Sequence, residues 1–528
     1  MSTVPPDTPV PPDTPTAQRR SAPLGWVLAV VLLVVALAAA GTVAVVQSAR
    51  LSDAREDVAA LEAQAAADAA TIEELQSEPA LPDAFGDVFG EGGLEDLLGE
   101  DGPLGEMFGE GGGLEDLFGG EGGLEDLFGA VAEAPDVTAC LSDVEDLPDV
   151  SDADLATQFD EVAGAVEVLR GAEFPSAIEP TLMTGEEISE VFTDEVTEVY
   201  PAEEADADRR ILAALGAVDA DIDLIQTQID LLGAQVAGYY DDETQDLVVR
   251  ADAADEPLGG LGLISLAHEM EHALTDAVVG FPDLDAFGDD EDGQLAALSV
   301  VEGSAVALQS RFQTASLSLS TLLTDPGLLD TDQGLDEVPP YIADSLTFPY
   351  LAGPSYTCGL YGEGGWDAVD AAVAEPPATT HEIMFPSAAG VEYVDVPQPS
   401  GPDGYELVTR RTFGAAPLSW LFAAPDGDEA AALDDPEAAV EGWRGGAASL
   451  FTAGEDSAVA LVLAGEALCD PVTEWWRAGA TGEEAAAQAP EVLVRATAEG
   501  EWGVVSCDGA DVRVGIGPSA EVARAAIS

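Results

Sequence analysis

Residues 260–279 read GLGLISLAHEMEHALTDAVV, and this stretch decides the fold. Apolar side chains recur throughout it at helical spacings, which predicts a helix packed inside a domain. His268 and His272 are four residues apart, so one helical turn places both imidazoles on the same face. Glu269 follows directly after the first histidine. The acidic residues inside the run exclude a transmembrane helix at this point.

Two imidazoles one turn apart can bind a single metal ion, and zinc is the ion that such a pair most often holds. The chain contains only 3 histidines, so finding two of them at this spacing beside a glutamate is informative. We predict that His268 and His272 are ligands of Zn²⁺. Glu269 is then placed to take a proton from a metal-activated water and to pass it to a leaving amine. The pattern indicates metal-assisted peptide-bond hydrolysis.

A catalytic zinc site needs a third protein ligand and leaves its fourth position for water. Glu302 is the expected ligand, because it lies in the most apolar part of the next predicted helix, LSVVEGSAVAL at 298–308. A buried carboxylate needs a partner, and a divalent cation is a good one. The acidic residues between 283 and 292 lie in a polar connecting segment and are expected to be solvated. Asp276, one turn past His272, is a candidate for orienting a ligand imidazole.

At these residues the sequence resembles the active helix of thermolysin-like gluzincins, the HExxH metallopeptidases whose third ligand is a glutamate on a following helix. A larger part of the chain, about 160–520, is similar to a group of bacterial zincin-like proteins. Ser304 stands where that group tends to carry an acid, and Phe385 where it tends to carry a histidine. The matching pieces are Gly238-Tyr239-Tyr240-Asp241, Val301-Glu302-Gly303, Phe348-Pro349-Tyr350 with Gly353, Gly364-Gly365-Trp366 and Pro376-Pro377-Ala378-Thr379-Thr380.

The resemblance implies a zincin fold and a zinc metalloendopeptidase-like activity on a peptide or protein substrate. Such an enzyme also needs a hydrogen-bond donor to the oxyanion that forms at the scissile carbonyl. Tyr350 is the preferred candidate, and Tyr239, Tyr240 and His381 are the alternatives.

The charge balance is extreme, with 103 acidic residues against 16 basic ones and a net charge of -87. All the basic residues are arginines. So acidic a chain cannot bind a nucleic-acid backbone electrostatically, and nucleic acid is excluded as a partner. Most of the carboxylates are expected to solvate the surface.

The first quarter of the chain changes character several times, and the composition predicts five segments. The uncharged run at 24–46 would span about 34 Å as a helix, enough to cross a bilayer, although a cleaved signal peptide is the alternative. The predicted segments are a Pro-rich disordered tail (1–22), a transmembrane helix (23–47), a helical stalk or weak coiled coil (50–78), a spacer rich in glycine and acid that repeats GGLEDL (79–136) and a zincin-like ectodomain (137–528).

These segments predict a protein of the cell membrane that crosses it once and carries its C-terminal domain outside the cytoplasm. A coiled coil at 50–78 would make the protein a homodimer, whereas a solvated stalk would not. The 4 cysteines allow three pairings. Cys469 with Cys507 is preferred because both lie in the last segment, which leaves Cys140 with Cys358; four buried free thiols are the alternative.

Predicted elements after residue 137 mix helices with strands, so the expected fold class is α+β with a mostly helical core. Helices are predicted at 152–170, 185–200, 203–235, 260–279, 294–314, 436–452, 455–468 and 482–489, and strands at 244–250, 492–498, 503–507 and 512–516.

Two other functions compete with the peptidase. One is a catalytically silent zincin-fold protein that binds zinc and a partner without turnover. The other is a cell-surface scaffold with neither zinc nor activity, in which the acidic residues serve hydration or calcium. Metal content and peptide cleavage separate the three, because fold alone does not give function.

Overall fold

We describe a computed structural model of the chain. It describes residues 136–235, 238–251, 257–318, 321, 338–388, 390–423, 432–478, 491–496 and 502–528. The predicted tail (1–22), transmembrane helix (23–47), stalk (50–78) and all but the last residue of the spacer (79–136) lie outside these residues. Within the described part of the chain, no helix combines the length and the apolar character that a membrane crossing requires.

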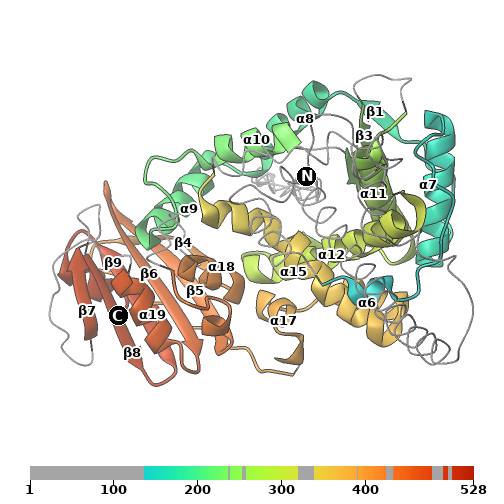
Figure 1. The fold of residues 1–528 in the computed structure, drawn as a ribbon. Helices are drawn as coiled ribbons and strands as arrows, with labels where there is room; N and C mark the ends of the chain where they lie inside the picture. Colours follow the sequence, from blue (N-terminus) through green and yellow to red (C-terminus); the bar gives the residue numbers. More distant parts are fainter. Residues whose placement is uncertain are drawn as a thin grey trace, which may run out of the picture.

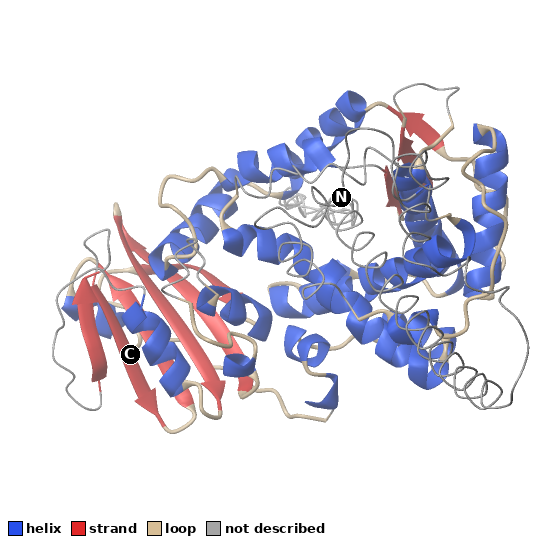
Figure 2. Ribbon diagram, in the orientation of Figure 1, coloured by secondary structure: helices blue, strands red, loops and turns tan. Residues whose placement is uncertain are grey.

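The architecture is α+β, as the sequence predicts, with most helices at one end and a large sheet at the other (Figures 1 and 2). The helices are α6 (Thr138–Leu141), α7 (Leu155–Arg170), α8 (Gly185–Val199), α9 (Ala202–Leu215), α10 (Leu224–Gln235), α11 (Gly260–Val278), α12 (Glu291–Ser316), α15 (Pro340–Gly364), α16 (Trp366–Ala374), α17 (Thr380–Met384), α18 (Ala415–Phe422), α19 (Cys469–Ala478) and α20 (Ala520–Ala526).

The strands form two sheets. In the small sheet, of order β1-β3-β2, β3 pairs in parallel with β1 and antiparallel with β2, which leaves β2 at an edge. The large sheet has the order β4-β5-β6-β9-β8-β7 and is antiparallel throughout. The strands are β1 (Thr181–Met183), β2 (Gly238–Asp241), β3 (Asp246–Arg250), β4 (Glu406–Thr412), β5 (Trp443–Ala453), β6 (Asp456–Gly465), β7 (Glu491–Ala496), β8 (Trp502–Asp508) and β9 (Asp511–Gly517).

Two of the predicted helices are wrong. The segments 436–452 and 455–468 largely form the hairpin of β5 and β6 rather than helices. Their alanines favour a helix, and β6 is buried from Ala458 to Gly465 without the alternation that marks a half-exposed strand. The reason is that both faces of the large sheet are covered: α20 packs with Ala458 and Ala460, whereas Val459 and Leu461 join the main core.

The other predictions agree more closely with the structure. The predicted helix at 203–235 is two helices, α9 and α10, and the strand predicted at 244–250 is β3. The last three predicted strands correspond to β7, β8 and β9, whereas the helix predicted at 482–489 lies outside the described residues. One apolar cluster joins α12, α15 and α18 to the large sheet, and a second one surrounds α11.

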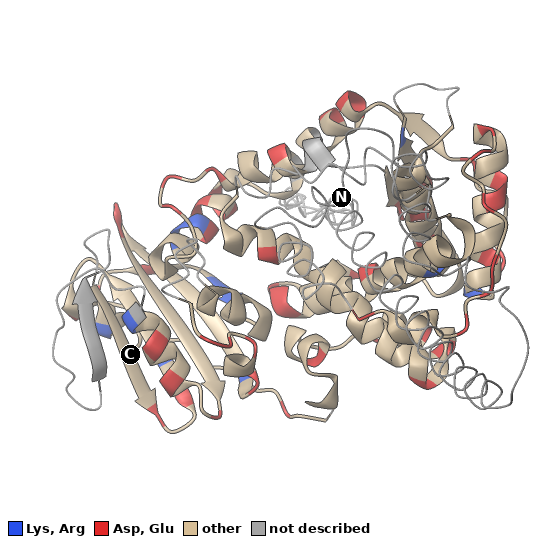
Figure 3. Cartoon of the chain, in the orientation of Figure 1, with Lys and Arg blue, Asp and Glu red and all other residues tan. Residues whose placement is uncertain are grey.

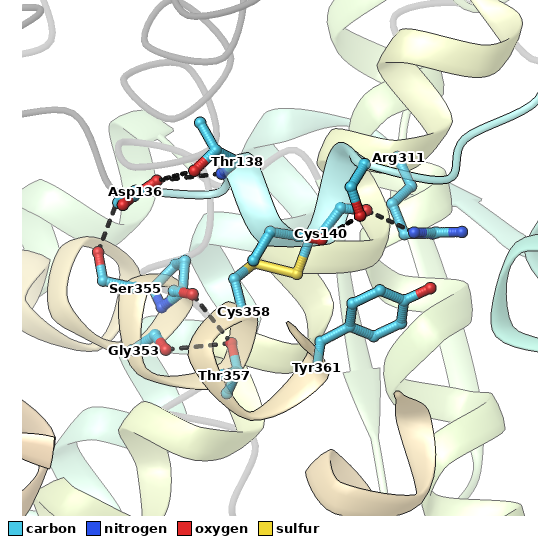
Figure 4. The surroundings of a disulfide bond; sticks show 12 residues. Asp136, Thr138, Cys140, Arg311, Gly353, Ser355, Thr357, Cys358 and Tyr361 are labelled. Carbon is cyan, nitrogen blue, oxygen red and sulfur yellow. Dashed lines mark hydrogen bonds between the residues drawn. A yellow bond between two sulfur atoms is a disulfide. The ribbon is translucent and has the colours of Figure 1, made fainter. Parts of the chain in front are cut away.

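Both preferred cysteine pairings are confirmed. Cys469 is bonded to Cys507, and Cys140 is bonded to Cys358. The second disulfide attaches α6 to α15, and further contacts surround it (Figure 4). Arg311 of α12 donates hydrogen bonds to the carbonyl of Cys140 and to Asp143, and its guanidinium lies 4.9 Å from the Tyr361 ring centroid. The start of the described chain is therefore bound firmly to α12 and α15.

Acidic residues occur along the helices and loops at both ends of the molecule, and the few arginines lie among them in the chain (Figure 3). Most of the acidic residues in the described ranges are at least partly exposed, in keeping with a solvating role. The exceptions are the buried carboxylates of α11 and of α12, which include Glu269, Glu271, Asp292 and Glu302.

Candidate metal centre

α11 holds the two predicted histidines where the sequence places them. The helix begins after Gly259 and is buried almost continuously from Gly260 to Thr275, because α7, α12 and the small sheet all pack against it. His268, Glu269 and His272 have no exposed surface. Helices that are apolar on every side occur in the centre of a domain, which explains how α11 carries polar groups into the interior.

The third predicted ligand meets the two histidines from α12. Nε2 of His268 lies 3.0 Å from Nε2 of His272, and Oε2 of Glu302 lies 3.3 Å and 3.4 Å from these two nitrogens. Four ligands at about 2.0–2.1 Å around zinc form a tetrahedron with edges of about 3.3–3.4 Å. The triangle therefore has the size of one face of a zinc site, and it is the group of potential metal ligands found among the described residues.

Gln309, which the sequence analysis did not single out, fixes the orientation of one ligand. Its Oε1 lies 3.0 Å from Nδ1 of His268. An amide oxygen can only accept, so the proton lies on Nδ1 and the lone pair of Nε2 faces the other ligands. Gln309 follows Glu302 by seven residues, two turns along the same buried face of α12, and that spacing is the signal that could have found it.

Asp276 does not have the role expected of it. Its Oδ2 accepts a hydrogen bond of 2.8 Å from the hydroxyl of Tyr240, rather than from an imidazole. Nδ1 of His272 is buried and has no hydrogen-bond partner among the described residues. Asp276 therefore ties α11 to β2 instead of orienting His272.

Glu269, the predicted catalytic residue, lies beside the triangle with both carboxyl oxygens buried and without a hydrogen-bond partner of ordinary geometry in the described part. Burial raises the pKa of Glu269 to about 8, with a further contribution from Glu302, whereas His268 and the backbone of Tyr240 oppose the rise. A carboxyl with a pKa near neutrality can both accept and return a proton at physiological pH.

The charges of the ligands favour the assembly. Burial alone would raise the pKa of Glu302, but the two histidines outweigh it and hold this pKa below its ordinary value. Burial likewise opposes the charged form of His272, and the Glu302 carboxylate overcomes this and raises the His272 pKa. A divalent cation would serve the same carboxylate more fully, because Oε1 of Glu302 makes no hydrogen bond of ordinary geometry among the described residues and faces only the hydroxyl of Tyr350 as a weak partner.

Tyr350 of α15 is the one oxyanion candidate that contacts the ligands. Its ring stacks on the His268 ring, with centroids 6.4 Å apart and planes inclined by 28°. Burial, together with the charges of Glu302 and Glu269, holds the pKa of Tyr350 well above its ordinary value, so the hydroxyl keeps its proton. That hydroxyl is buried and makes no hydrogen bond of ordinary geometry to the described residues.

The other three candidates make their hydrogen bonds elsewhere. The hydroxyl of Tyr239 faces the sulfur of Met183, and that of Tyr240 bonds to Asp276. Nε2 of His381 donates a hydrogen bond to the carbonyl of Glu441, and Nδ1 faces the hydroxyl of Tyr393. The ring also stacks on Trp443 of β5. His381 therefore belongs to the junction between α17 and the large sheet.

Glycines bring the surrounding elements close to the centre. A Cβ on Gly303 would lie 2.4 Å from the carbonyl carbon of Gly353, so α12 and α15 cross at backbone contact just beside Glu302. Tyr350 lies one turn before Gly353 on α15 and is carried over the ligands by this crossing. A Cβ on Gly238 would lie 2.6 Å from the carbonyl of Val248 and 3.4 Å from Cγ of Glu269, so β2 also passes close to the centre.

Comparison of the chain with protein-family models, with curated proteins and with solved structures finds no match.

Proposed function

We propose that the chain is a zinc-dependent metallopeptidase with a zincin-like fold, in which His268, His272 and Glu302 bind the metal and Glu269 is the catalytic residue. The observation that carries the proposal is the triangle of potential ligand atoms with 3.0–3.4 Å sides beside the fully buried carboxylate of Glu269. The donor atoms of three buried side chains converge on one point, and a buried carboxylate in such a position calls for a positive partner, which a divalent cation would supply.

The donor set fits zinc better than the alternatives. Two imidazole nitrogens and one carboxylate oxygen form a standard catalytic zinc set, whereas calcium and magnesium prefer oxygen ligands alone. Zinc bound there supplies Lewis-acid activation of a water molecule and of a carbonyl group. Gln309 keeps the His268 lone pair directed at that position.

The residues around the ligands can perform the proton transfers of peptide hydrolysis. Glu269 takes a proton from the attacking water on its carboxylate and then donates it to the leaving amine. Burial raises the pKa of Glu269 above that of a free carboxyl, which makes its carboxylate a stronger base. The Tyr350 hydroxyl, which keeps its proton and lies on a ring stacked on His268, would donate to the oxyanion of the scissile carbonyl.

An edge strand beside the centre supports a peptide substrate. β2 pairs with β3 on one side only within the described residues, and it passes Glu269 at Gly238. An extended peptide can add to such an edge by backbone hydrogen bonds. This geometry would align the scissile bond of a peptide or protein substrate with Glu269 and the ligands.

The cellular setting follows from the segments that precede the described residues. We propose that 23–47 anchors the protein in the cell membrane and that the part from 137 onward lies outside the cytoplasm. The two disulfides support this placement, because disulfides form and persist in oxidising compartments.

The test begins with metal content. The wild-type chain is expected to bind about one zinc, and His272→Ala and Glu302→Ala are each expected to lose it. Glu269→Gln keeps the ligands and the size of the side chain, so it is expected to retain zinc while hydrolysis of a peptide library falls by at least about 10²-fold. Undiminished cleavage by Glu269→Gln would contradict the mechanism, and a wild-type chain without zinc would contradict the metal centre.

The second candidate is a zinc-binding protein of the same fold without turnover. The full burial of His268, Glu269, His272 and Glu302 favours it, because a scissile carbonyl has to reach the metal. Stoichiometric zinc with no cleavage across the peptide library, in wild type as in Glu269→Gln, would establish this candidate and exclude the peptidase.

A further inference from the structure

A second glutamate of α11, Glu271, makes contacts that the proposed chemistry does not use. Its carboxylate has no exposed surface, and one oxygen collects three interactions. Oε1 accepts hydrogen bonds of 2.6 Å from the hydroxyl of Ser304 on α12 and of 2.6 Å from the hydroxyl of Thr275 on α11. It also forms an ion pair of 3.4 Å with Nε of Arg170 at the end of α7.

Arg170 is itself immobilised, so it gives Glu271 a fixed partner. Its side chain is 2% exposed, and it also pairs with Asp370 of α16. The guanidinium carbon lies 4.4 Å from the centroid of the Trp366 ring, and the indole N–H of Trp366 donates to the carbonyl of Leu169, next to Arg170. One buried network therefore joins α7, α11, α12 and α16.

This network lies close to the proposed metal ligands on both α11 and α12. Glu271 lies between His268 and His272 on α11, and Ser304 follows Glu302 by two residues on α12. The bond of 2.6 Å from Ser304 to Glu271 thus joins the two helices within one turn of every ligand. Metal–ligand distances tolerate only about 0.2 Å of variation, so the spacing of α11 and α12 has to be held closely.

We propose that Glu271 and Ser304 are positioning residues for the metal, forming a clamp that sets the distance of Glu302 from the two histidines. The proposal rests on the metal centre described above. Stability is a weak reason for such an arrangement, because a buried ion pair seldom stabilises more than a well-packed apolar pair would. The best-attested use of buried charges is to fix the register of packed helices. Here the relative position of α11 and α12 determines whether Glu302 meets the two histidines.

The chain offers a matched pair of variants. Ser304→Ala removes the hydrogen bond to Glu271 that crosses from α12 to α11. Thr275→Val removes a hydrogen bond of the same length to the same oxygen, together with the bond that this hydroxyl accepts from Arg170 of α7. It leaves the bond that joins α11 to α12 in place. Ser304→Thr keeps the crossing hydroxyl and serves as the conservative variant.

The measurement is the zinc dissociation constant of the full-length chain, determined by competition with a chelator and paired with the visible spectrum of the cobalt(II)-substituted protein. Ser304→Ala is expected to weaken zinc binding by about 10–100-fold and to alter the cobalt spectrum. Thr275→Val and Ser304→Thr are expected to stay within a few-fold of wild type, with an unchanged spectrum.

The possible results distinguish a failure of the clamp from a failure of the metal centre. Equal zinc affinities in Ser304→Ala and Thr275→Val would overturn the clamp and leave the proposed function standing. A wild-type chain that binds no zinc would overturn both. If Ser304→Ala does not fold, Ser304→Thr still decides, because a loss of zinc affinity in a variant that retains the hydroxyl would contradict the clamp.

Discussion

At the scale of single residues, the interior of this acidic protein holds several carboxyls at defined places. Glu302 and Glu269 lie at the proposed metal centre, Glu271 lies in the proposed clamp, and Asp292 lies at the start of α12. Asp292 accepts hydrogen bonds from the backbone N–H and the hydroxyl of Thr380, and that hydroxyl in turn accepts from the N–H of Ala416. The carboxyl of Asp292 thus joins the first turns of α17 and α18 to α12.

Asp292 gives the protein a predictable dependence on pH. Burial raises its pKa to about 7, Asp290 and Glu382 add to the rise, and the hydrogen bonds from Thr380 oppose it. Between about pH 4 and pH 7 the folded chain holds a proton that the unfolded chain has released, so the free energy of unfolding falls as the pH rises through this window. Asp292→Asn is expected to remove up to about 4 kcal/mol of that fall.

Urea unfolding at pH 5 and pH 8 measures the effect, with Glu363→Gln, a change at an exposed carboxyl of α15, as the control. The difference in stability between the two pH values should shrink in Asp292→Asn and stay as in wild type in the control. An equal pH dependence in all three proteins would show that Asp292 is not the responsible group.

Residue-scale prediction succeeded where a single helix carries the signal. The spacing of His268 and His272 and the apolar setting of Glu302 identified residues that the structure brings together, although His268 and Glu302 are 34 positions apart in the sequence. Arg170 could not be found in the same way, because its ion pair with Glu271 joins residues 101 positions apart and depends on how α7 packs. Gln309 follows Glu302 at helical spacing on α12, but its role becomes visible only when the position of the His268 ring is known.

At the scale of elements, the sequence pattern predicts α11 correctly but mistakes the hairpin of β5 and β6 for helices. The helix predicted at 260–279 differs from α11 by one residue, and Gly280, whose φ is 83°, follows its end. β5 and β6 are almost uniformly buried, so their apolar runs carry no period of two, and alanine adds a helical bias. The sheet exists because of what covers its faces, and local sequence does not encode that.

The close crossing of α12 and α15 leaves no room for the methyl group that Gly303→Ala would add. Gly303→Ala would place a Cβ 2.4 Å from backbone atoms of Gly353, so the two helices have to separate. Overpacking of this kind costs roughly 1–3 kcal/mol, which outweighs a gain in helix propensity of up to about 1 kcal/mol. Zinc affinity is expected to fall as well, because Glu302 and Tyr350 lie on the separating helices.

Gly359 of α15 provides the matched control, since a Cβ there meets nothing within 4 Å. Gly359→Ala is expected to raise the melting temperature slightly and to leave zinc affinity unchanged. A melting temperature of Gly303→Ala at or above that of wild type would show that the crossing has room to adapt.

At the scale of the whole molecule, the two disulfides constrain very different lengths of chain. Cys140–Cys358 closes a separation of 218 residues, and Cys469–Cys507 one of 38. In the chain-entropy description these loops correspond to about 5 and about 4 kcal/mol of stabilisation. Replacing both cysteines of a pair by serine is therefore expected to lower the melting temperature in each case, and more for Cys140 with Cys358.

Thermal unfolding of the two double variants, followed by circular dichroism, checks this order. Added reductant should lower the wild-type melting temperature below that of either double variant. A larger effect of the Cys469–Cys507 pair would show that local contacts, rather than loop length, decide the contribution of these bonds.

The Cys140–Cys358 bond also determines whether cleavage of the chain by a protease releases a fragment. Every peptide bond between residues 141 and 357, including those of α11 and α12, lies inside the covalent ring that this bond closes. A single cut there opens the ring but separates nothing: the two fragments remain one molecule until a reductant reaches the sulfurs. Clipped protein would thus migrate as an intact chain on a non-reducing gel and as two fragments on a reducing one, with all the proposed zinc ligands still tethered together.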